Sequence, residues 1–109
     1  MKIVGIAACT AGIAHTYIAK EKLIKAAQQA GHEICMETQG TIGRQDELSA
    51  EKINEADVVI IAADVKVSGK ERFEGKKIIE IPTEIVIRAP KKLIKRVENL
   101  IDEANQVQS

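Results

Sequence analysis

Apolar and polar positions follow two periods along the chain, one typical of buried strands and the other typical of amphipathic helices. Short apolar runs at residues 3–8 and 58–62 are typical of strands that are buried on both faces of a sheet. Two further strands are expected at residues 33–38 and 77–81. In a strand at 33–38 the side chains alternate, so Ile34 and Met36 share one face and Cys35 lies on the opposite one.

Helical spacing of apolar residues fills the segments between these strands. A first helix follows the loop after the first strand, with apolar residues at helical spacing from Ala19 to Ala30, and ends at Gly31, a residue that tolerates a positive φ. Ser49 is a candidate N-cap of a short second helix that ends near Ala56. A helical turn is expected at residues 83–88. Pro90 suits the first position of a closing helix.

Strands and helices therefore alternate in the order strand, helix, strand, helix, strand, strand, helix. This order predicts an α/β fold of three layers, in which helices flank a four-stranded, mostly parallel sheet with strand order 2-1-3-4. Such an arrangement is flavodoxin-like, or like that of the low-molecular-weight phosphatases. Residues 1–105 are expected to form a single domain, and residues 106–109 a frayed tail.

Composition narrows the possible functions. The 109 residues contain 16 basic and 16 acidic side chains, one Tyr, one Phe and no Trp. A zero net charge and scarce aromatic residues argue against nucleic-acid binding. No apolar run reaches the roughly 20 residues of a membrane span, and no signal peptide precedes the first strand. The cytoplasm is the expected location. The two cysteines form neither a disulfide framework nor a zinc motif.

The stretch from Cys9 to Thr16 is the main candidate site. It leaves the carboxyl end of the first strand and enters a helix, which is where parallel α/β sheets bind ligands. Free N–H groups at the start of a helix suit an anion, and the same field makes a thiol there more nucleophilic. Cys9 is either such a nucleophile or a buried structural cysteine. The predicted topology favours the nucleophile, because the first strand lies at the switch point of the sheet.

Other polar residues are expected at the same edge. A loop is predicted at residues 38–43, and its glycines follow Glu37, Thr38 and Gln39. These three side chains either face a partner or brace the loop. Asp64 follows the central strand at 58–62 and either acts near Cys9 or holds loop amides.

Three chemistries of a nucleophilic cysteine can be compared. A papain-like site needs a distant His, and the only histidines are His15 and His32. Phosphatases and arsenate reductases of this loop type need Arg after Cys and five intervening residues, because guanidinium clamps two phosphoryl oxygens. His15 stands at that position instead. The loop is therefore better suited to accept a phosphoryl group from a partner protein than to hydrolyse free phosphate esters.

No cofactor is expected, because Gly5 and Gly12 do not make a dinucleotide fingerprint and no metal-ligand set is visible.

Four stretches together resemble one protein family. They are residues 9–17 (CTAGIAHTY), 37–40 (ETQG), 60–64 (IIAAD) and 72–76 (RFEGK). They resemble the fructose-type IIB component of the bacterial phosphoenolpyruvate-dependent sugar phosphotransferase system. The similarity covers about residues 2–103, nearly the whole chain.

This resemblance implies a cytoplasmic phosphotransferase that acts as a phosphocarrier. A phosphohistidine on the IIA partner donates its phosphoryl group to Cys9, and the phosphocysteine then phosphorylates a sugar held by the membrane partner IIC. The resemblance implies that the phosphoryl group is cradled by a loop of seven residues: Thr10, Ala11, Gly12, Ile13, Ala14, His15 and Thr16.

The sequence departs from the family at two positions of the loop. Thr10 stands where the family commonly has Pro, and Ala11 where it often has a polar residue. The alternatives that stay open are a cysteine-dependent phosphatase or arsenate reductase and a non-catalytic regulatory domain. The sequence does not distinguish fructose from mannose, mannitol or a glycoside.

Overall fold

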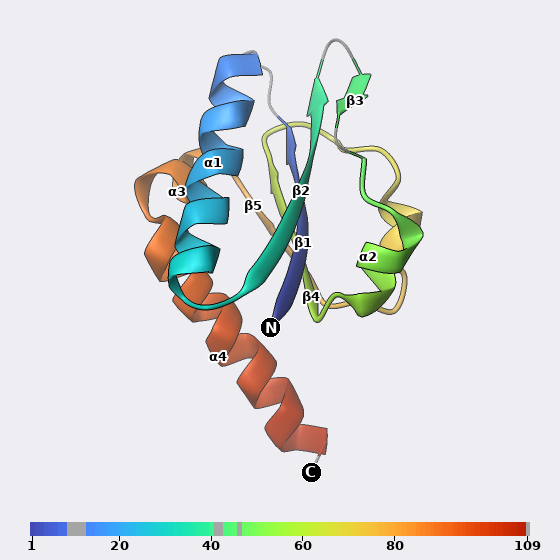
Figure 1. Ribbon diagram of the computed structural model, residues 1–109, viewed down its shortest axis with the longest axis vertical. Helices are drawn as coiled ribbons and strands as arrows, with labels where there is room; N and C mark the ends of the chain where they lie inside the picture. Colours follow the sequence, from blue (N-terminus) through green and yellow to red (C-terminus); the bar gives the residue numbers. More distant parts are fainter. Residues whose placement is uncertain (9–12, 41–42, 46, 109) are drawn as a thin grey trace.

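The computed structural model describes residues 1–8, 13–40, 43–45 and 47–108, with the backbone alone given for 13–15, 40, 43–45 and 103–108. Five strands form one sheet in the order β3-β2-β1-β4-β5 (Figure 1). The strands are β1 (Lys2–Ala8), β2 (Glu33–Gly40), β3 (Gly43–Gln45), β4 (Val58–Ala63) and β5 (Ile78–Ile81). The helices are α1 (Ile13–Gln29), α2 (Ala50–Glu55), the 3₁₀ turn η1 (Lys70–Phe73), α3 (Thr83–Arg88) and α4 (Pro90–Gln108).

Four of the strands confirm the predicted parallel sheet. β1 pairs in parallel with β2 on one side and with β4 on the other, and β5 pairs in parallel with β4. In order of sequence these strands are the predicted 2-1-3-4 arrangement. β1 is central, as expected of an apolar segment without polar alternation.

The predicted loop at residues 38–43 is wrong. β2 continues to Gly40 and forms a hairpin with β3, which pairs antiparallel through Thr38 with Gln45 and Gly40 with Gly43. An antiparallel neighbour needs only a tight turn, so two glycines and a few polar residues suffice to build it. The hairpin also gives the outer edge of β2 hydrogen-bond partners that an open edge would lack.

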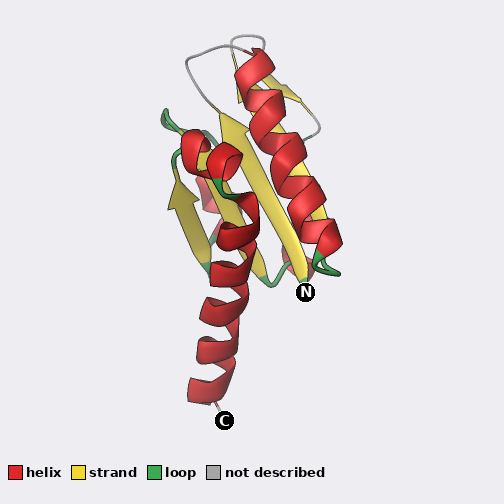
Figure 2. Cartoon of the chain, turned by 90° about the vertical axis from the view of Figure 1, so that its left-hand side faces the viewer, coloured by secondary structure: helices red, strands yellow, loops and turns green. Residues whose placement is uncertain are grey.

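The sheet separates two apolar cores, and Figures 1 and 2 show helices on both of its faces. α1, α3 and α4 cover one face, where Ile3 and Ala7 of β1 are buried. α2 and η1 lie on the other face, where Val4 and Ile6 of β1 are buried with Phe73. Cys35 packs at the edge of this second core and Met36 lies in the first, which confirms the predicted alternation in β2.

The predicted helix boundaries are largely confirmed. Ser49 Oγ accepts a hydrogen bond of 3.2 Å from the backbone N of Lys52, as an N-cap should. Gly31 has a φ of 84° directly beyond α1. Pro90 is the first residue of α4, which continues to Gln108, so the fraying of residues 106–109 stays a prediction. No helix within the described part of the chain is long and apolar enough to cross a membrane.

Candidate functional site

The carboxyl edge of the parallel strands brings together the ends of three strands. Ala8, the last residue of β1, pairs in register with Gln39 of β2 and with Ala63 of β4. The backbone N of Asp64 donates to the carbonyl oxygen of Ala8 over 3.0 Å. α1 starts at the same end of the sheet, at the top of Figure 1. This edge is where a parallel α/β sheet binds its ligand.

Cys9 and the first three residues of the predicted loop fall outside the described residues. Cys9, Thr10, Ala11 and Gly12 lie there, so their roles stay predictions. Ile13, Ala14 and His15 form the first turn of α1, and their backbone is helical. The first N–H groups of a helix have no partners within it and carry a partial positive charge. α1 therefore starts at the carboxyl edge, where the predicted site requires a helix start, and the binding of an anion there stays a prediction.

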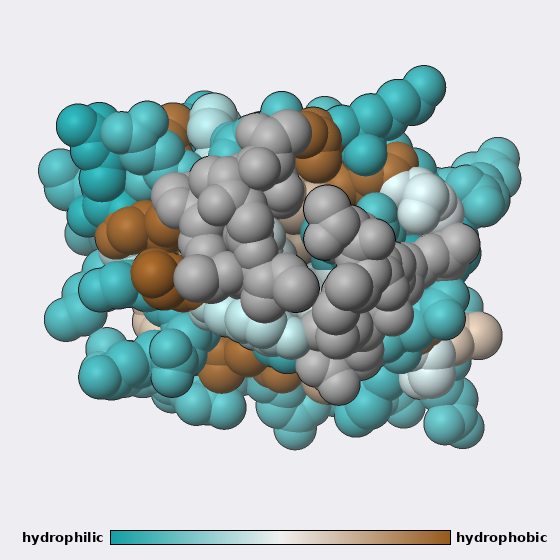
Figure 3. Space-filling view, turned by 90° about the horizontal axis from the view of Figure 1, so that it is seen from above, coloured by the Kyte–Doolittle hydropathy of each residue, from teal (hydrophilic) through white to brown (hydrophobic). Residues whose placement is uncertain are grey.

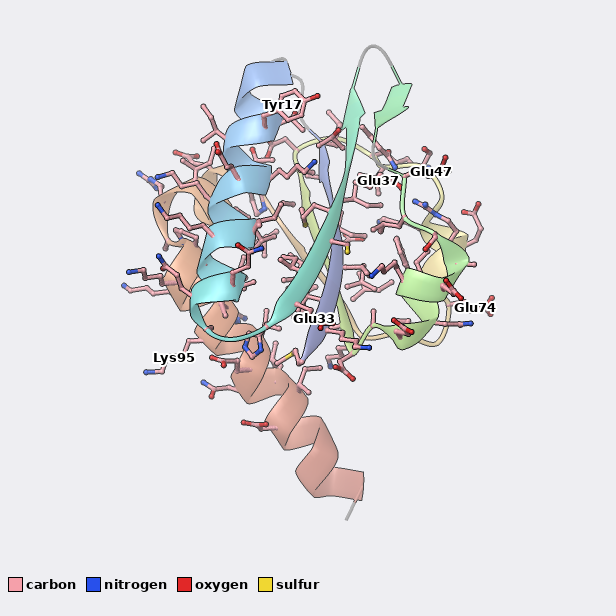
Figure 4. All side chains as sticks on the ribbon, in the orientation of Figure 1. Tyr17, Glu33, Glu37, Glu47, Glu74 and Lys95 are labelled. Carbon is pink, nitrogen blue, oxygen red and sulfur yellow. The ribbon has the colours of Figure 1, made fainter. Side chains whose placement is uncertain are left out.

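Thr16 and Tyr17, the next two residues of α1, differ in solvent exposure. Thr16, in the first turns of α1, is only 4% exposed. Tyr17 is 40% exposed and lies near the upper end of α1 in Figure 4. Thr16 therefore faces inward at the carboxyl edge, whereas Tyr17 presents aromatic surface to the outside.

His32 lies away from this edge. It immediately precedes β2, at the amino end of the sheet, where its Nδ1 is 3.1 Å from the terminal amine of Met1. Its Nε2 is 2.9 Å from a carboxylate oxygen of Glu98 on α4. His32 thus joins the amino terminus to α4. It lies at the opposite end of the sheet from Ala8, the residue that precedes Cys9 in the sequence, which argues against a papain-like role for His32.

Asp64 has a structural role at the carboxyl edge. One carboxylate oxygen accepts from the backbone N of Thr83 over 3.0 Å, and the other accepts from the Thr83 hydroxyl over 2.5 Å. Asp64 thereby ties the end of β4 to the first residue of α3. Of the two predicted roles, the one that the contacts support is the binding of a loop amide.

Glu37 is the centre of a buried ionic network that the sequence did not predict. Its side chain is 0% exposed and forms a two-pronged pair with Arg72, with N–O distances of 2.8 and 3.1 Å. It also accepts from the backbone N of Leu48 over 3.0 Å and from the amide of Gln39 over 2.7 Å. Figure 4 shows Glu37 on the side of the sheet that faces α2. The network joins three segments that are distant in sequence.

These partners set the charge of Glu37. Burial raises the pKa of its carboxyl, but the hydrogen bonds from Arg72, Gln39 and Leu48 outweigh it and hold the pKa below its usual value. The carboxylate in turn raises the pKa of Arg72. Glu37 is therefore an ionised structural residue rather than a proton donor.

The same network fixes the segment before η1. Gln39 accepts from the backbone N of Ser68 and donates to the Ser68 carbonyl oxygen, both over 2.9 Å. Arg72 donates through Nε to the Gly69 carbonyl oxygen over 2.7 Å. Gly69 has a φ of 79°, and a Cβ there would lie 2.7 Å from Arg72 Nε, so this position needs glycine. Of the two roles expected for Glu37 and Gln39, the contacts support bracing, although the braced residues are Leu48 and 68–72 rather than the predicted loop.

Thr38 differs from its two neighbours. It is 4% exposed, and its hydroxyl oxygen has no hydrogen-bond partner among the described residues. Within the same part of the chain no group of three His, Cys, Asp or Glu side chains is placed to hold a metal ion.

Comparison with known proteins identifies the family of this arrangement. The model of the family "PTS system, Lactose/Cellobiose specific IIB subunit" matches residues 4–96. A fructose-like EIIB component 2 of Escherichia coli K12 is 39% identical over 97 residues, which are 89% of this chain and 92% of that protein. A fructose-specific EIIABC component of Bacillus subtilis is 41% identical over 98 residues, 90% of this chain and 15% of that longer protein.

Solved structures agree with these relatives. The Enzyme IIB subunit of the PTS system from Escherichia coli K12 superposes with a TM-score of 0.88 at 36% identity, over 95% of this chain and 96% of that one. A domain of the fructose-specific IIABC component of Borrelia burgdorferi has a TM-score of 0.81 at 39% identity, over 89% and 92% of the two chains. From sequence and fold alike, the chain belongs to the family of IIB subunits of the PTS system.

Proposed function

We propose that this protein is a cytoplasmic phosphocarrier of a sugar phosphotransferase system. It accepts a phosphoryl group from a phosphohistidine on IIA at Cys9 and passes it to a sugar held by the membrane protein IIC. The names of the relatives, which are fructose-like and fructose-specific, support a fructose-type sugar over the lactose or cellobiose named by the family model.

One observation carries the proposal: in a member of the IIB family, the residue that follows the last residue of β1 in the sequence is a cysteine, Cys9. β1 ends at Ala8 and α1 begins at Ile13, so a four-residue link that begins with Cys9 connects the central strand to a helix start. Cys35 lies in the middle of β2, paired in register with Val4. Cys9 is therefore the thiol that chain connectivity assigns to the anion-binding end of α1.

The reaction consists of two phosphoryl transfers. The Cys9 thiolate attacks phosphorus in line, the S–P bond forms and the P–N bond of the phosphohistidine breaks, and the imidazole nitrogen that leaves takes up a proton. In the second step a sugar hydroxyl attacks phosphorus and loses its proton, the S–P bond breaks, and the Cys9 thiolate is regenerated.

The start of α1 provides the electrostatic support for both steps. Charge spreads over the three equatorial oxygens in the transition state, and preorganised N–H donors stabilise it. In the proposed site these donors belong to Thr10–Thr16, with His15 at the position where a phosphatase has arginine. Holding the anion without a guanidinium clamp suits a group that has to leave again.

Apolar side chains around the carboxyl edge support docking of protein partners there. Tyr17 and Ile18 near the start of α1, Val65 just beyond β4 and Ile85 in the first turn of α3 are all at least 36% exposed. Figure 3, which views the molecule from this end, shows brown apolar surface at several places. Thr38 is buried, and Gln39 is hydrogen-bonded to Glu37 and Ser68. We therefore propose this apolar set, rather than side chains of residues 38–43, for contact with IIA and IIC.

Transfer from phosphorylated IIA tests the proposal. The cognate IIA, loaded with radioactive phosphate from phosphoenolpyruvate through the general components of the system, is mixed with this protein. We expect one phosphoryl group per chain, on a cysteine located by mass spectrometry of peptides at mild pH. No transfer from any fructose-type IIA protein would contradict the proposal.

Hydrolysis of p-nitrophenyl phosphate separates the carrier from a phosphatase. Because His15 stands where a phosphatase of this loop type has arginine, we expect turnover at the level of the buffer blank. The measurement is release of p-nitrophenolate by the metal-free protein, with a low-molecular-weight phosphatase as positive control. Sustained turnover that depends on Cys9 would favour the phosphatase alternative.

A further inference from the structure

The strongest unexplained feature at the carboxyl edge is the hydroxyl of Thr38. We propose that this hydroxyl donates a hydrogen bond to the phosphoryl group carried by Cys9, so that β2 contributes a binding residue to the site. This inference rests on the proposed function. It adds Thr38, a residue of β2, to the phosphoryl-binding residues proposed in the loop Thr10–Thr16.

The hydroxyl is buried without a partner. The residue is 4% exposed, and within the described part of the chain its Oγ1 is the buried side-chain atom that lacks any hydrogen bond. A buried polar group without a partner lowers stability, and nearly all such groups in proteins are paired. An unpaired hydroxyl therefore indicates a partner that the protein alone does not supply.

Thr38 lies near the carboxyl end of β2, on the face of the sheet that α1 covers. Thr38 pairs in register with Ala7, two residues before Cys9 in the chain. Side chains alternate along β2, so Thr38 shares the face of Met36, which packs against α1 in the core with Ala19 and Leu23. α1 starts at the carboxyl edge, so Thr38, two residues nearer that edge than Met36, lies opposite the first turns of α1, where Thr16 is also buried.

The neighbours of Thr38 are not available for this role. Glu37 and Gln39 point to the other face of β2, where Arg72 and Ser68 use their polar atoms. Glu37 is moreover negatively charged and would repel a phosphoryl group. A neutral hydroxyl at the α1 face is the donor that β2 can offer to an anion at the start of α1.

Two substitutions of Thr38 separate binding from packing. Thr38→Val removes the hydroxyl and keeps the shape and the β-branching, whereas Thr38→Ser keeps the hydroxyl and removes a methyl group. Each variant is equilibrated with a fixed ratio of phosphorylated to free IIA, and the phosphorylated fraction and the urea midpoint of the unphosphorylated protein are measured.

The two variants should change in opposite directions. For Thr38→Val we expect the equilibrium constant for phosphorylation to fall about tenfold, as for the loss of one hydrogen bond to a charged group, while the urea midpoint rises because an unpaired buried hydroxyl is gone. For Thr38→Ser we expect near-normal phosphorylation and a lower urea midpoint.

Equal phosphorylation of Thr38→Val and the wild type would overturn the inference and leave the proposed function intact. A parallel fall of phosphorylation and of the urea midpoint in both variants would also overturn it, because it would indicate a role in packing alone. Failure of the wild type to accept phosphate is a different result, which contradicts the proposed function itself.

Discussion

Replacing Cys9 by serine is expected to abolish phosphoryl transfer from IIA completely. A serine hydroxyl is not ionised near neutral pH, whereas a thiol at the start of a helix is partly thiolate and is intrinsically more nucleophilic. The change replaces one sulfur by one oxygen, so we expect the circular dichroism spectrum and the urea midpoint to stay close to those of the wild type. The measurement is radioactive labelling from phosphorylated IIA, followed over time.

Cys35→Ser is the matched control, because it makes the same chemical change in the other cysteine. Cys35 is a free, half-buried thiol in the middle of β2, at the edge of the core on the α2 side. We expect this variant to be labelled as fully as the wild type. Labelling that survives in Cys9→Ser, or that disappears in Cys35→Ser, would show that Cys9 is not the phosphorylated cysteine and would contradict our proposal.

The sequence predicted the layers of the fold because its signals there are local. The apolar run of β4 and the helical spacing in α1 each specify their own element, and short connections leave few ways to arrange them. Ser49 also acts within one turn of chain, on Lys52. The position of Cys9 after a central strand follows from these elements and needs no contact between distant residues.

The features that the sequence did not predict depend on partners far along the chain. Glu37 and Arg72 are 35 positions apart, and neither has a local pattern that indicates the other. The one available signal is Glu37 itself, a glutamate in a strand next to the apolar residues Cys35 and Met36. A carboxylate buried in such surroundings needs a partner such as a cation. The hairpin of β2 and β3 was missed because glycine and polar residues predict a loop and an edge strand equally well.

The unpaired hydroxyl of Thr38 is likewise visible only in the structure. Threonine is common in strands, and its sequence context does not tell whether its hydroxyl finds a partner. The structure separates Thr38 from Gln39, which the sequence had placed in one group with it. Gln39 holds the backbone of Ser68 on the α2 side of the sheet, and Thr38 lies on the α1 side at the carboxyl edge.

Replacing Arg72 by methionine is expected to lower the free energy of unfolding by about 3 kcal/mol at pH 7. Methionine keeps most of the length of arginine, but it leaves the carboxylate of Glu37 at 0% exposure without its cation. The backbone N of Leu48 and the amide of Gln39 still donate to Glu37, and they are neutral. The measurement is urea unfolding, followed by circular dichroism.

The pH dependence of this loss has a definite sign. In the wild type the pKa of Glu37 is below its usual value, so its contribution is present above the pKa of the unfolded chain and is lost as pH falls through the folded pKa. Without Arg72, burial dominates and raises the folded pKa above the unfolded one, so the variant gains stability as Glu37 takes up a proton. The difference between wild type and variant should therefore shrink between pH 7 and about pH 5.

Glu37→Gln provides the control, alone and combined with Arg72→Met. The glutamine oxygen can still accept from the backbone N of Leu48, while Arg72, whose side chain is 19% exposed, can turn to water. Glu37→Gln should therefore cost less than Arg72→Met, and the double variant should be more stable than Arg72→Met alone, because no unpaired charge stays buried. If the two single losses of stability instead add in the double variant, the unpaired carboxylate of Glu37 is not the cause of the destabilisation. The bracing of residues 68–72 then depends on packing of the Arg72 side chain over Phe73, because the guanidinium carbon lies 5.1 Å from the centre of that ring.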